Sequence, residues 1–291
     1  MAGRSHREFT TAMLFLLPAV AAVLTLIALP VIDAVVMSFQ RVALSGVREP
    51  IGLRNYEILL NQPRFWSNLR LSFVYLSGNL LLCVPIGYGA AMLLAAELRA
   101  ASHLRTLFLF PWVMTPAVTA LIFQSLVDPV AGPVTYLSRV LTGRSVYVLI
   151  DPDLALLTLV IHSAWRSFPL VMLFVGAGIA AIPREIYDAA SLDGASGWRL
   201  FRHVTLPLTR TQLFIVVLVV TAFTLQDAES VYALTGGGPG NATEVLAVRL
   251  MKEAFVNLNL GLGAAISVAL LIAGALAMIG YALLVREERT T

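Results

Sequence analysis

Charged residues are scarce in this chain. Asp, Glu, Lys and Arg make up only 13% of its 291 residues, whereas 58% are hydrophobic and the mean hydropathy is +0.84. A soluble domain carries about 25% charge, so a surface this poor in charge would leave apolar area facing water. The composition excludes an ordinary soluble domain and indicates a protein whose solvent is a lipid bilayer.

Cysteine and lysine are nearly absent. The single cysteine, Cys83, lies within an apolar run, which excludes an internal disulfide framework and a thiolate metal site. All but one of the 20 basic residues are arginine, and the one lysine, Lys252, precedes Glu253. A phosphate-binding GxxxxGK[ST] loop is therefore excluded, so any use of ATP belongs to another subunit. His162 and His203 have no clustered metal-ligand partners, and we expect no metal site.

Long hydrophobic runs are what the sequence does have. A helix needs about 20 apolar residues to cross the hydrocarbon layer. Six runs meet this length: 12–37, 69–95, 105–127, 154–181, 211–233 and 262–285. Lipid cannot satisfy unpaired backbone groups, so the runs must be helices, broken only where protein or water covers the backbone. The sequence predicts an all-α integral membrane protein with six transmembrane helices and both termini on one side.

The first run and the short connections suggest an orientation. The run follows Arg4 and Arg7, as in a signal peptide, but its apolar stretch from Ala12 to Ile32 exceeds the usual 7–15 residues, which favours an uncleaved anchor. The positive-inside rule weighs short loops near span ends. The tight Glu97–Arg105 connection and the arginine-bearing 182–210 loop favour the cytoplasm, so both termini are expected to be cytoplasmic.

Prolines within the runs have two interpretations. Pro111, Pro116 and Pro169 each remove a backbone hydrogen bond and can kink a helix. Breaks that line a pore are possible, but ordinary tolerated kinks are the favoured interpretation.

The loop 182–210 mixes charge with regularly spaced apolar residues. Pro183 suits the first turn of a helix, which we expect to end at Asp193-Gly194. Asp193 or Ser196 is expected to cap a second helix, and Pro207 to stop that helix before the next span. Two short amphipathic helices joined at a glycine either lie on lipid headgroups or fit a groove in a partner.

Several motifs are similar to those of a known family. The stretches Asp188-Ala189-Ala190, Asp193-Gly194-Ala195 and Val204-Thr205-Leu206-Pro207 resemble the EAA loop of ABC-importer permeases. The carbohydrate branch, of the maltose-transporter type, is resembled by further stretches: Gly52-Leu53-Arg54-Asn55-Tyr56, Phe110-Pro111-Trp112, Trp165 with Pro169, Gly176-Ala177-Gly178-Ile179 before Ile182-Pro183, and Leu234-Thr235-Gly236-Gly237-Gly238-Pro239. The resemblance covers nearly the whole chain.

The resemblance implies the permease fold of type I ABC importers in a prokaryotic cytoplasmic membrane. It implies an anchor helix with an extracytoplasmic segment at 1–68, a permease core at 69–285 and a cytoplasmic tail at 286–291. The implied partners are a sister permease subunit, two ATPase subunits and an extracytoplasmic solute-binding protein. This chain would be non-catalytic and hold no cofactor, with ATP and magnesium bound by the ATPase subunits.

In the family, the EAA loop is the coupling helix seated in the ATPase subunit. The resemblance assigns ATPase docking to nine residues: Tyr187, Asp188, Ala189, Ala190, Asp193, Gly194, Ala195, Trp198 and Phe201. The chain departs from the family pattern in having Asp rather than Glu at position 188, so its carboxylate is one methylene shorter. A direct salt bridge from this position is expected to be weakened or lost.

Polar residues inside spans are costly, so function is the default hypothesis for them. Arg166 is expected near the middle of the fourth span and Asp227 toward the outer half of the fifth, where they either pair with each other or contact substrate. The resemblance places a set of residues on the substrate pathway: Arg166, Ser167, Leu170, Thr224 and Asp227. Glu229 and Gln124 are weaker candidates, and Asp128 is expected in a turn.

Three classes of function remain to be compared. An ATP-driven importer permease for a carbohydrate is the first interpretation, with glycerol phosphate or glycerophosphodiesters as the alternative substrate because Arg166 suits an anion. An uncoupled six-span channel offers no reason for the 182–210 loop. An intramembrane enzyme would need a convergent nucleophile and base or a metal cluster, and neither HExxH nor GxSxG occurs.

Overall fold

The computed structural model describes residues 13, 15–43, 45–96 and 101–287. Arg4, Arg7 and residues 288–291 of the predicted tail lie outside these ranges. Within them the backbone is mostly helical, which confirms the predicted all-α fold. The chain divides into two compact units: one holds the described residues up to Pro63 together with Leu250–Ala269, and the other holds Arg64–Arg249 with the described residues from Leu270 onward.

The first unit contains the predicted anchor helix, followed by two short strands and a short helix. Its long helix runs from Phe15 to Ser38 and includes the π-helical turn η1 (Leu24–Ala28) and α2 (Leu29–Ser38). Two short antiparallel strands, β1 (Gln40–Val42) and β2 (Arg48–Pro50), lead to α3 (Arg54–Leu60). The Asn55 amide donates to the carbonyls of Ser38 (2.9 Å) and Gln40 (3.0 Å), which ties α3 to the end of the anchor helix.

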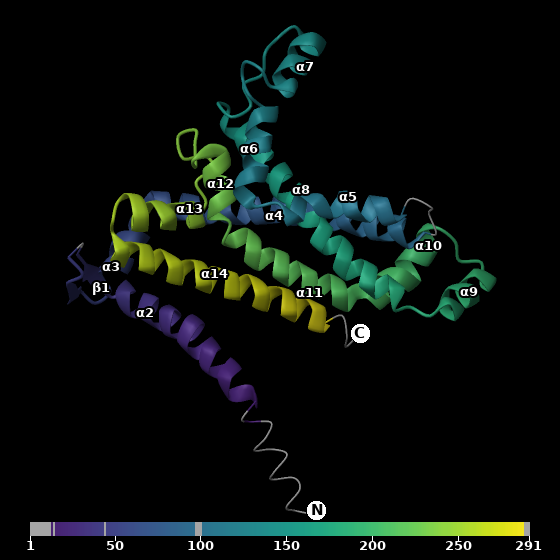
Figure 1. Ribbon diagram of the computed structural model, residues 1–291, viewed down its shortest axis with the longest axis horizontal. Helices are drawn as coiled ribbons and strands as arrows, with labels where there is room; N and C mark the ends of the chain where they lie inside the picture. The colour runs from purple at the N-terminus through teal and green to yellow at the C-terminus, as the bar shows by residue number, and fades with distance from the viewer. Residues whose placement is uncertain (1–12, 14, 44, 97–100, 288–291) are drawn as a thin grey trace, which may run out of the picture. The chain divides into compact units, whose positions relative to one another are not determined.

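The second unit contains most of the remaining helices. In chain order they are α4 (Pro63–Ala95), α5 (Ala101–Val113), α6 (Pro116–Leu126), α7 (Pro133–Thr142), α8 (Pro152–Ala180), α9 (Arg184–Leu192), α10 (Trp198–Leu200), η2 (Phe201–Thr205), α11 (Leu206–Leu225), α12 (Ala228–Thr235) and α13 (Leu246–Met251). In this unit α4, α5, α8 and α11 run along a common direction, with α9 and α10 at one end (Figure 1). The chain then passes through η3 (Lys252–Val256) into α14 (Leu260–Glu287).

Five described helices are long and apolar enough to cross a membrane. They are Phe15–Ser38, Pro63–Ala95, Pro152–Ala180, Trp198–Leu225 and Leu260–Leu283. A sixth crossing is obtained if the pair Ser102–Val113 and Pro116–Leu126 counts as one span, although the pair is bent by 99°. The predicted span 105–127 is therefore a broken helix.

The break in the third span corrects the interpretation of Pro116 as an ordinary kink. Thr115 is extended (φ −64°, ψ 147°), the conformation that a following proline favours, and Pro116 opens α6 in its first turn. Pro111 and Pro169, by contrast, lie inside continuous helices. The third span is thus interrupted at one proline and continuous at another.

The predicted fifth span, 211–233, is wrong at both ends. Its helix begins at Trp198, because Pro207 does not stop it: the proline lies in the first turn of α11, directly after the π-helical turn η2. In that wider turn the amide of Leu206 bonds the carbonyl of Phe201 five residues back, so the helix changes register just before the proline. The helix ends at Leu225, since the side chain of Asp227 starts α12 instead.

Small residues allow α4 and α8 to pack closely. A Cβ added to Gly87 would lie 2.5 Å from the Val171 Cβ and 2.6 Å from the Phe168 carbonyl oxygen, so only glycine fits there. Around this contact Cys83, Val171, Val175 and Val216 are fully buried. This core holds α8 and α11 together, and both helices carry residues of the cavity described next.

Candidate functional site

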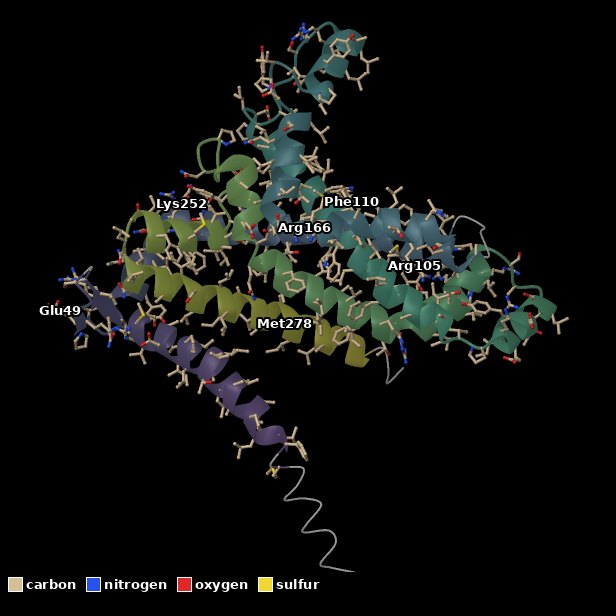
Figure 2. All side chains as sticks on the ribbon, viewed as in Figure 1. Glu49, Arg105, Phe110, Arg166, Lys252 and Met278 are labelled. Carbon is tan, nitrogen blue, oxygen red and sulfur yellow. The ribbon has the colours of Figure 1, made fainter. Side chains whose placement is uncertain are left out.

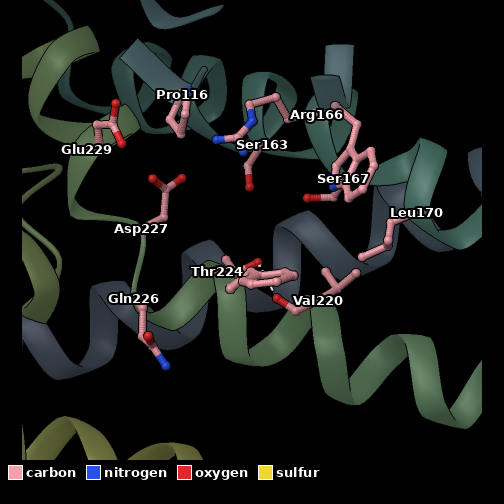
Figure 3. Close-up of a pocket in the computed structure, with 12 residues that line it drawn as sticks. Pro116, Ser163, Arg166, Ser167, Leu170, Val220, Thr224, Gln226, Asp227 and Glu229 are labelled. Atoms are coloured by element: carbon pink, nitrogen blue, oxygen red, sulfur yellow. Dashed lines mark hydrogen bonds between the residues drawn. The ribbon is translucent and has the colours of Figure 1, made fainter. Parts of the chain in front are cut away.

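A cavity of about 280 Å³ lies in the second unit between the α5–α6 break, α8, α11 and the start of α12 (Figure 3). Its lining is Trp112, Pro116, Ser163, Arg166, Ser167, Leu170, Val220, Phe223, Thr224, Gln226, Asp227 and Glu229. Six of the seven predicted substrate-pathway residues are therefore brought together. The exception is Gln124, whose amide donates to the carbonyl of Leu234 (3.5 Å) and helps to join α6 to α12.

Arg166 and Asp227 both face this cavity but do not pair. Arg166 Nη1 donates to Ser230 Oγ (3.1 Å), while its Nε is buried without a hydrogen-bond partner in the described structure. Asp227 accepts from the Ser230 amide (3.0 Å) and from the Tyr75 hydroxyl (3.1 Å). The described residues contain no ion pair between them, so a direct Arg166–Asp227 salt bridge is not the reason that these charges lie here.

Asp227 is positioned differently from the prediction. It does not lie within the fifth span but follows its end, where its carboxylate caps α12. The side chain of Glu229 accepts from the Ala117 amide (3.3 Å) in the first turn of α6. Two helix N-termini, with their partial positive charge, therefore meet two carboxylates at the edge of the cavity.

Sequence reasoning missed a polar stripe on α4. Asn68, Ser72, Tyr75 and Asn79 are all at least 97% buried and recur at the helical period. Tyr75 holds Asp227, and Asn79 donates to Thr224 Oγ1 (2.7 Å). Regularly spaced polar residues in an otherwise apolar span were the available signal, since such residues need partners on a neighbouring helix.

The same stripe holds Glu244, which lies between the glycine-rich stretch 236–240 and α13. Arg64 bonds both carboxylate oxygens of Glu244 (2.8 Å each), whose side chain is fully buried. Arg249, 2% exposed, donates to Asn68 (3.2 Å), and Asn68 also donates to Glu244. The result is a buried polar network that fixes the segment to α4.

We expect Arg64→Met to destabilise the protein by about 2 to 3 kcal/mol, because it leaves the buried Glu244 carboxylate without its bidentate partner. The matched control is Arg48→Met, whose pair with Asp33 has side chains 42% and 49% exposed and should contribute less than about 1 kcal/mol. Thermal unfolding of the two purified variants in one detergent measures the difference. Equal losses of stability would contradict the assigned importance of the buried network.

The predicted docking residues lie on the segment between α8 and α11. Helix α9 ends at Leu192 with Asp193 as its C-cap, and Gly194 follows with φ +78° in open surroundings. The expected side-chain cap of the second helix by Asp193 or Ser196 is wrong, because Gly197 occupies the N-cap with φ +50° and no side-chain bond. Only glycine adopts that conformation readily, and it allows the chain to turn directly into α10.

The docking residues divide into an outward and an inward set. The outward set is exposed to solvent: Asp188, Ala189, Asp193, Gly194 and Trp198. The remaining four are partly buried: Tyr187, Ala190, Ala195 and Phe201.

Two of the inward residues bind the α9–α10 segment to other parts of the second unit. The ring of Phe201 packs edge-on against Tyr88 of α4 (5.3 Å), and the Tyr187 hydroxyl bonds Thr205 (3.3 Å). Leu192 was not in the predicted set, yet it is 90% exposed and lies on the outer surface of the segment.

Asp128 lies outside the cavity lining, in a turn as expected. Its carboxylate accepts from the amides of Ala131 (2.8 Å) and Val130 (2.9 Å). These two backbone bonds hold the pKa of Asp128 below its usual range. Among the described residues no group of three or more His, Cys, Asp or Glu side chains is arranged to hold a metal ion.

Known proteins resemble the chain in sequence and in fold. Residues 84–290 match the family described as binding-protein-dependent transport system inner membrane component. The trehalose/maltose transport system permease protein MalF of Thermococcus litoralis is 32% identical over 90% of this chain and 89% of its own. The sn-glycerol-3-phosphate transport system permease protein UgpA of Brucella abortus is 32% identical over 83% of each chain.

A solved structure has the same fold. It is a chain of a bacterial ABC transporter involved in the import of the acidic polysaccharide alginate, with a TM-score of 0.84, 16% identity and coverage of 98% of both chains. The predicted type I importer fold and the family resemblance are thereby confirmed. The chain belongs to the binding-protein-dependent transport system inner membrane components and is a permease subunit of an ABC importer.

Proposed function

We propose that this permease carries a neutral carbohydrate and that the cavity around Arg166 and Asp227 contacts it. The observation that carries the proposal is the mixture of groups in the cavity: a guanidinium, two carboxylates and several hydroxyls beside the rings of Trp112 and Phe223. A sugar hydroxyl both donates and accepts, so it can bond to an arginine and a carboxylate at once. The aromatic rings provide apolar surface for the opposite face of a sugar ring.

Glycerol phosphate is the second candidate substrate, since it is the substrate in the name of the UgpA relative. Arg166 and the α6 N-terminus favour an anion. Asp227 and Glu229 disfavour one, because two carboxylates in the same cavity repel a phosphate at close range. The balance of one cation against two anions supports the neutral substrate.

The proposed assembly places this chain beside a sister permease subunit, with one of two ATPase subunits docked at α9 and α10 and an extracytoplasmic binding protein at the opposite end. The family description as binding-protein-dependent supports the last partner. The arginine-bearing loop supports an orientation in which both termini and the α9–α10 segment face the cytoplasm. ATP and magnesium would be bound by the ATPase subunits, and this chain would hold no cofactor.

The helices of the cavity connect directly to the proposed docking segment. The helix Trp198–Leu225 has 28 residues and is therefore about 42 Å long, with Trp198 in the docking segment and Thr224 at the cavity. Helix α8 carries Arg166 and ends at Ala180, four residues before α9 begins at Arg184. Closure of the ATPase pair would thus move both walls of the cavity as rigid bodies, which is the means of alternating access in such transporters.

The test is uptake by vesicles that contain the complete importer. Radiolabelled neutral oligosaccharide and sn-glycerol 3-phosphate are offered separately with ATP inside. We expect accumulation of an oligosaccharide and none of the phosphate. Accumulation of the phosphate alone would contradict the carbohydrate proposal and establish the second candidate.

A further inference from the structure

A second and larger cavity, of about 970 Å³, lies where α4 and α8 end and where α5 and α9 begin. Its walls are formed by residues between Ala91 and Ala96, at the end of α4 and directly after it, and by residues between Met172 and Ile182, in α8 and the turn after it. Arg105 of α5 and Arg184 of α9 contribute to the lining as well. Figure 2 shows Arg105 close to this end of α5, well separated from Arg166. The cavity is therefore distinct from the one proposed for the carbohydrate.

The lining of this second cavity separates charge from apolar surface. Among the described residues that line it, Arg105 and Arg184 are the charged ones, and none is a carboxylate. Its two hydroxyl groups, Tyr187 and Thr205, bond to each other (3.3 Å). The rest is alanine, glycine and larger apolar side chains, of which Met92 is 40% exposed and Leu173 37% exposed.

The position of the cavity along the predicted spans limits which kinds of molecule could occupy it. Helices α4 and α8 are each long and apolar enough to span a bilayer, so their last residues are expected where a helix passes from hydrocarbon to headgroups. Among the described lining residues, a transported sugar would find acceptor side chains only in the paired hydroxyls of Tyr187 and Thr205. A molecule with one anionic end and a long apolar part matches both the arginines and the apolar walls.

We propose that this cavity binds one anionic phospholipid, with its phosphate at Arg105 and Arg184 and its acyl chains along the exposed side chains of α4 and α8. Two arginines in the described lining favour an anionic over a zwitterionic headgroup. The volume lies within the range of about 300–1,000 Å³ that is usual for sites of small ligands. Because Tyr187 also lines the cavity, the lipid would lie directly behind α9.

Two substitutions separate the charged from the apolar part of the site. Arg105→Gln removes a cation that makes no ion pair in the described structure. Gly176→Leu adds bulk inside the cavity, where an added Cβ would lie 3.9 Å from Ala91 Cβ, an ordinary contact. Arg202→Gln is the matched control, because Arg202 is exposed on η2 and does not line the cavity.

The measurement is native mass spectrometry of the full-length chain, released from nanodiscs of equal parts phosphatidylglycerol and phosphatidylcholine. The wild type is expected to retain one phosphatidylglycerol. Retention should fall about fivefold in Arg105→Gln, since one arginine contributes about 1 kcal/mol to the attraction of an anionic headgroup. Gly176→Leu should lose the lipid by steric exclusion, and Arg202→Gln should match the wild type.

Inorganic phosphate in excess distinguishes a lipid from a free anion. Retention of the lipid in its presence supports the proposal, whereas displacement would show a site for free phosphate and overturn it. Equal retention by the wild type, Arg105→Gln and Gly176→Leu would overturn it as well. None of these readouts requires transport, so failure here leaves the carbohydrate proposal unaffected.

Discussion

Arg166→Ala is expected to reduce carbohydrate uptake about 10- to 100-fold, the equivalent of losing one or two hydrogen bonds from a charged donor. The guanidinium lines the 280 Å³ cavity. Its Nη1 bonds Ser230, which leaves further N–H groups of the guanidinium for a substrate hydroxyl. Asp227 keeps its bonds from Ser230 and Tyr75 in the variant. The yield of assembled importer should therefore change little. Uptake by vesicles at equal importer content measures the effect.

Ser230→Ala is the control for a purely structural role of Arg166. This substitution removes the hydroxyl that Arg166 Nη1 contacts (3.1 Å) but leaves the guanidinium in the cavity. We expect Ser230→Ala to lose much less uptake than Arg166→Ala. Equal losses, or normal uptake by Arg166→Ala at normal yield, would remove Arg166 from the substrate site.

Gly194→Asp is expected to abolish the stimulation of ATP hydrolysis by substrate while leaving the subunit inserted. Gly194 has φ +78° and no heavy atom within 4 Å of an added Cβ, so an aspartate costs only about 1 kcal/mol of backbone strain. The new side chain would project from the turn between α9 and α10, where the ATPase subunit is proposed to dock. ATP hydrolysis by the complete importer, with and without loaded binding protein, measures the effect.

Gly143→Asp is the matched control for this variant. Gly143 has φ +71° and equally open surroundings, but it caps α7, outside the α9–α10 segment. The two glycines thus have similar φ angles and the two variants add the same charge, whereas the location differs. Normal stimulation in Gly194→Asp, or an equal loss in both variants, would count against the docking role of the turn.

The hydropathy of the sequence predicted the fold. Individual polar and charged residues in the hydrophobic runs predicted the candidate site. Hydrophobic runs place helices well, because lipid allows few alternatives. They do not show where a helix breaks: Pro116 interrupts the third span, whereas Pro111, Pro169 and Pro207 are accommodated. The difference depends on the backbone around each proline, in particular the extended Thr115 and the π-helical turn before Pro207.

Some residues that line the cavity could be predicted from the sequence. Arg166 and Asp227 were conspicuous because charges in a span are costly. Their geometry was not predictable: the capping of α12 by Asp227 and the contact of Arg166 with Ser230 depend on the break after Leu225. Tyr75 and Asn79 are neutral and were overlooked, although they hold Asp227 and Thr224 from α4. Such contacts join residues about 150 positions apart, 152 for the first pair and 145 for the second.

Uptake with and without the ATPase subunits tests the central claim most directly. Vesicles are prepared with this chain and its sister permease, either alone or with both ATPase subunits, and are supplied with binding protein outside and ATP inside. The account predicts that labelled carbohydrate accumulates only when the ATPase subunits and ATP are both present. Passage of the carbohydrate through the permease pair alone, at a rate that ATP does not change, would show an uncoupled pore and contradict it.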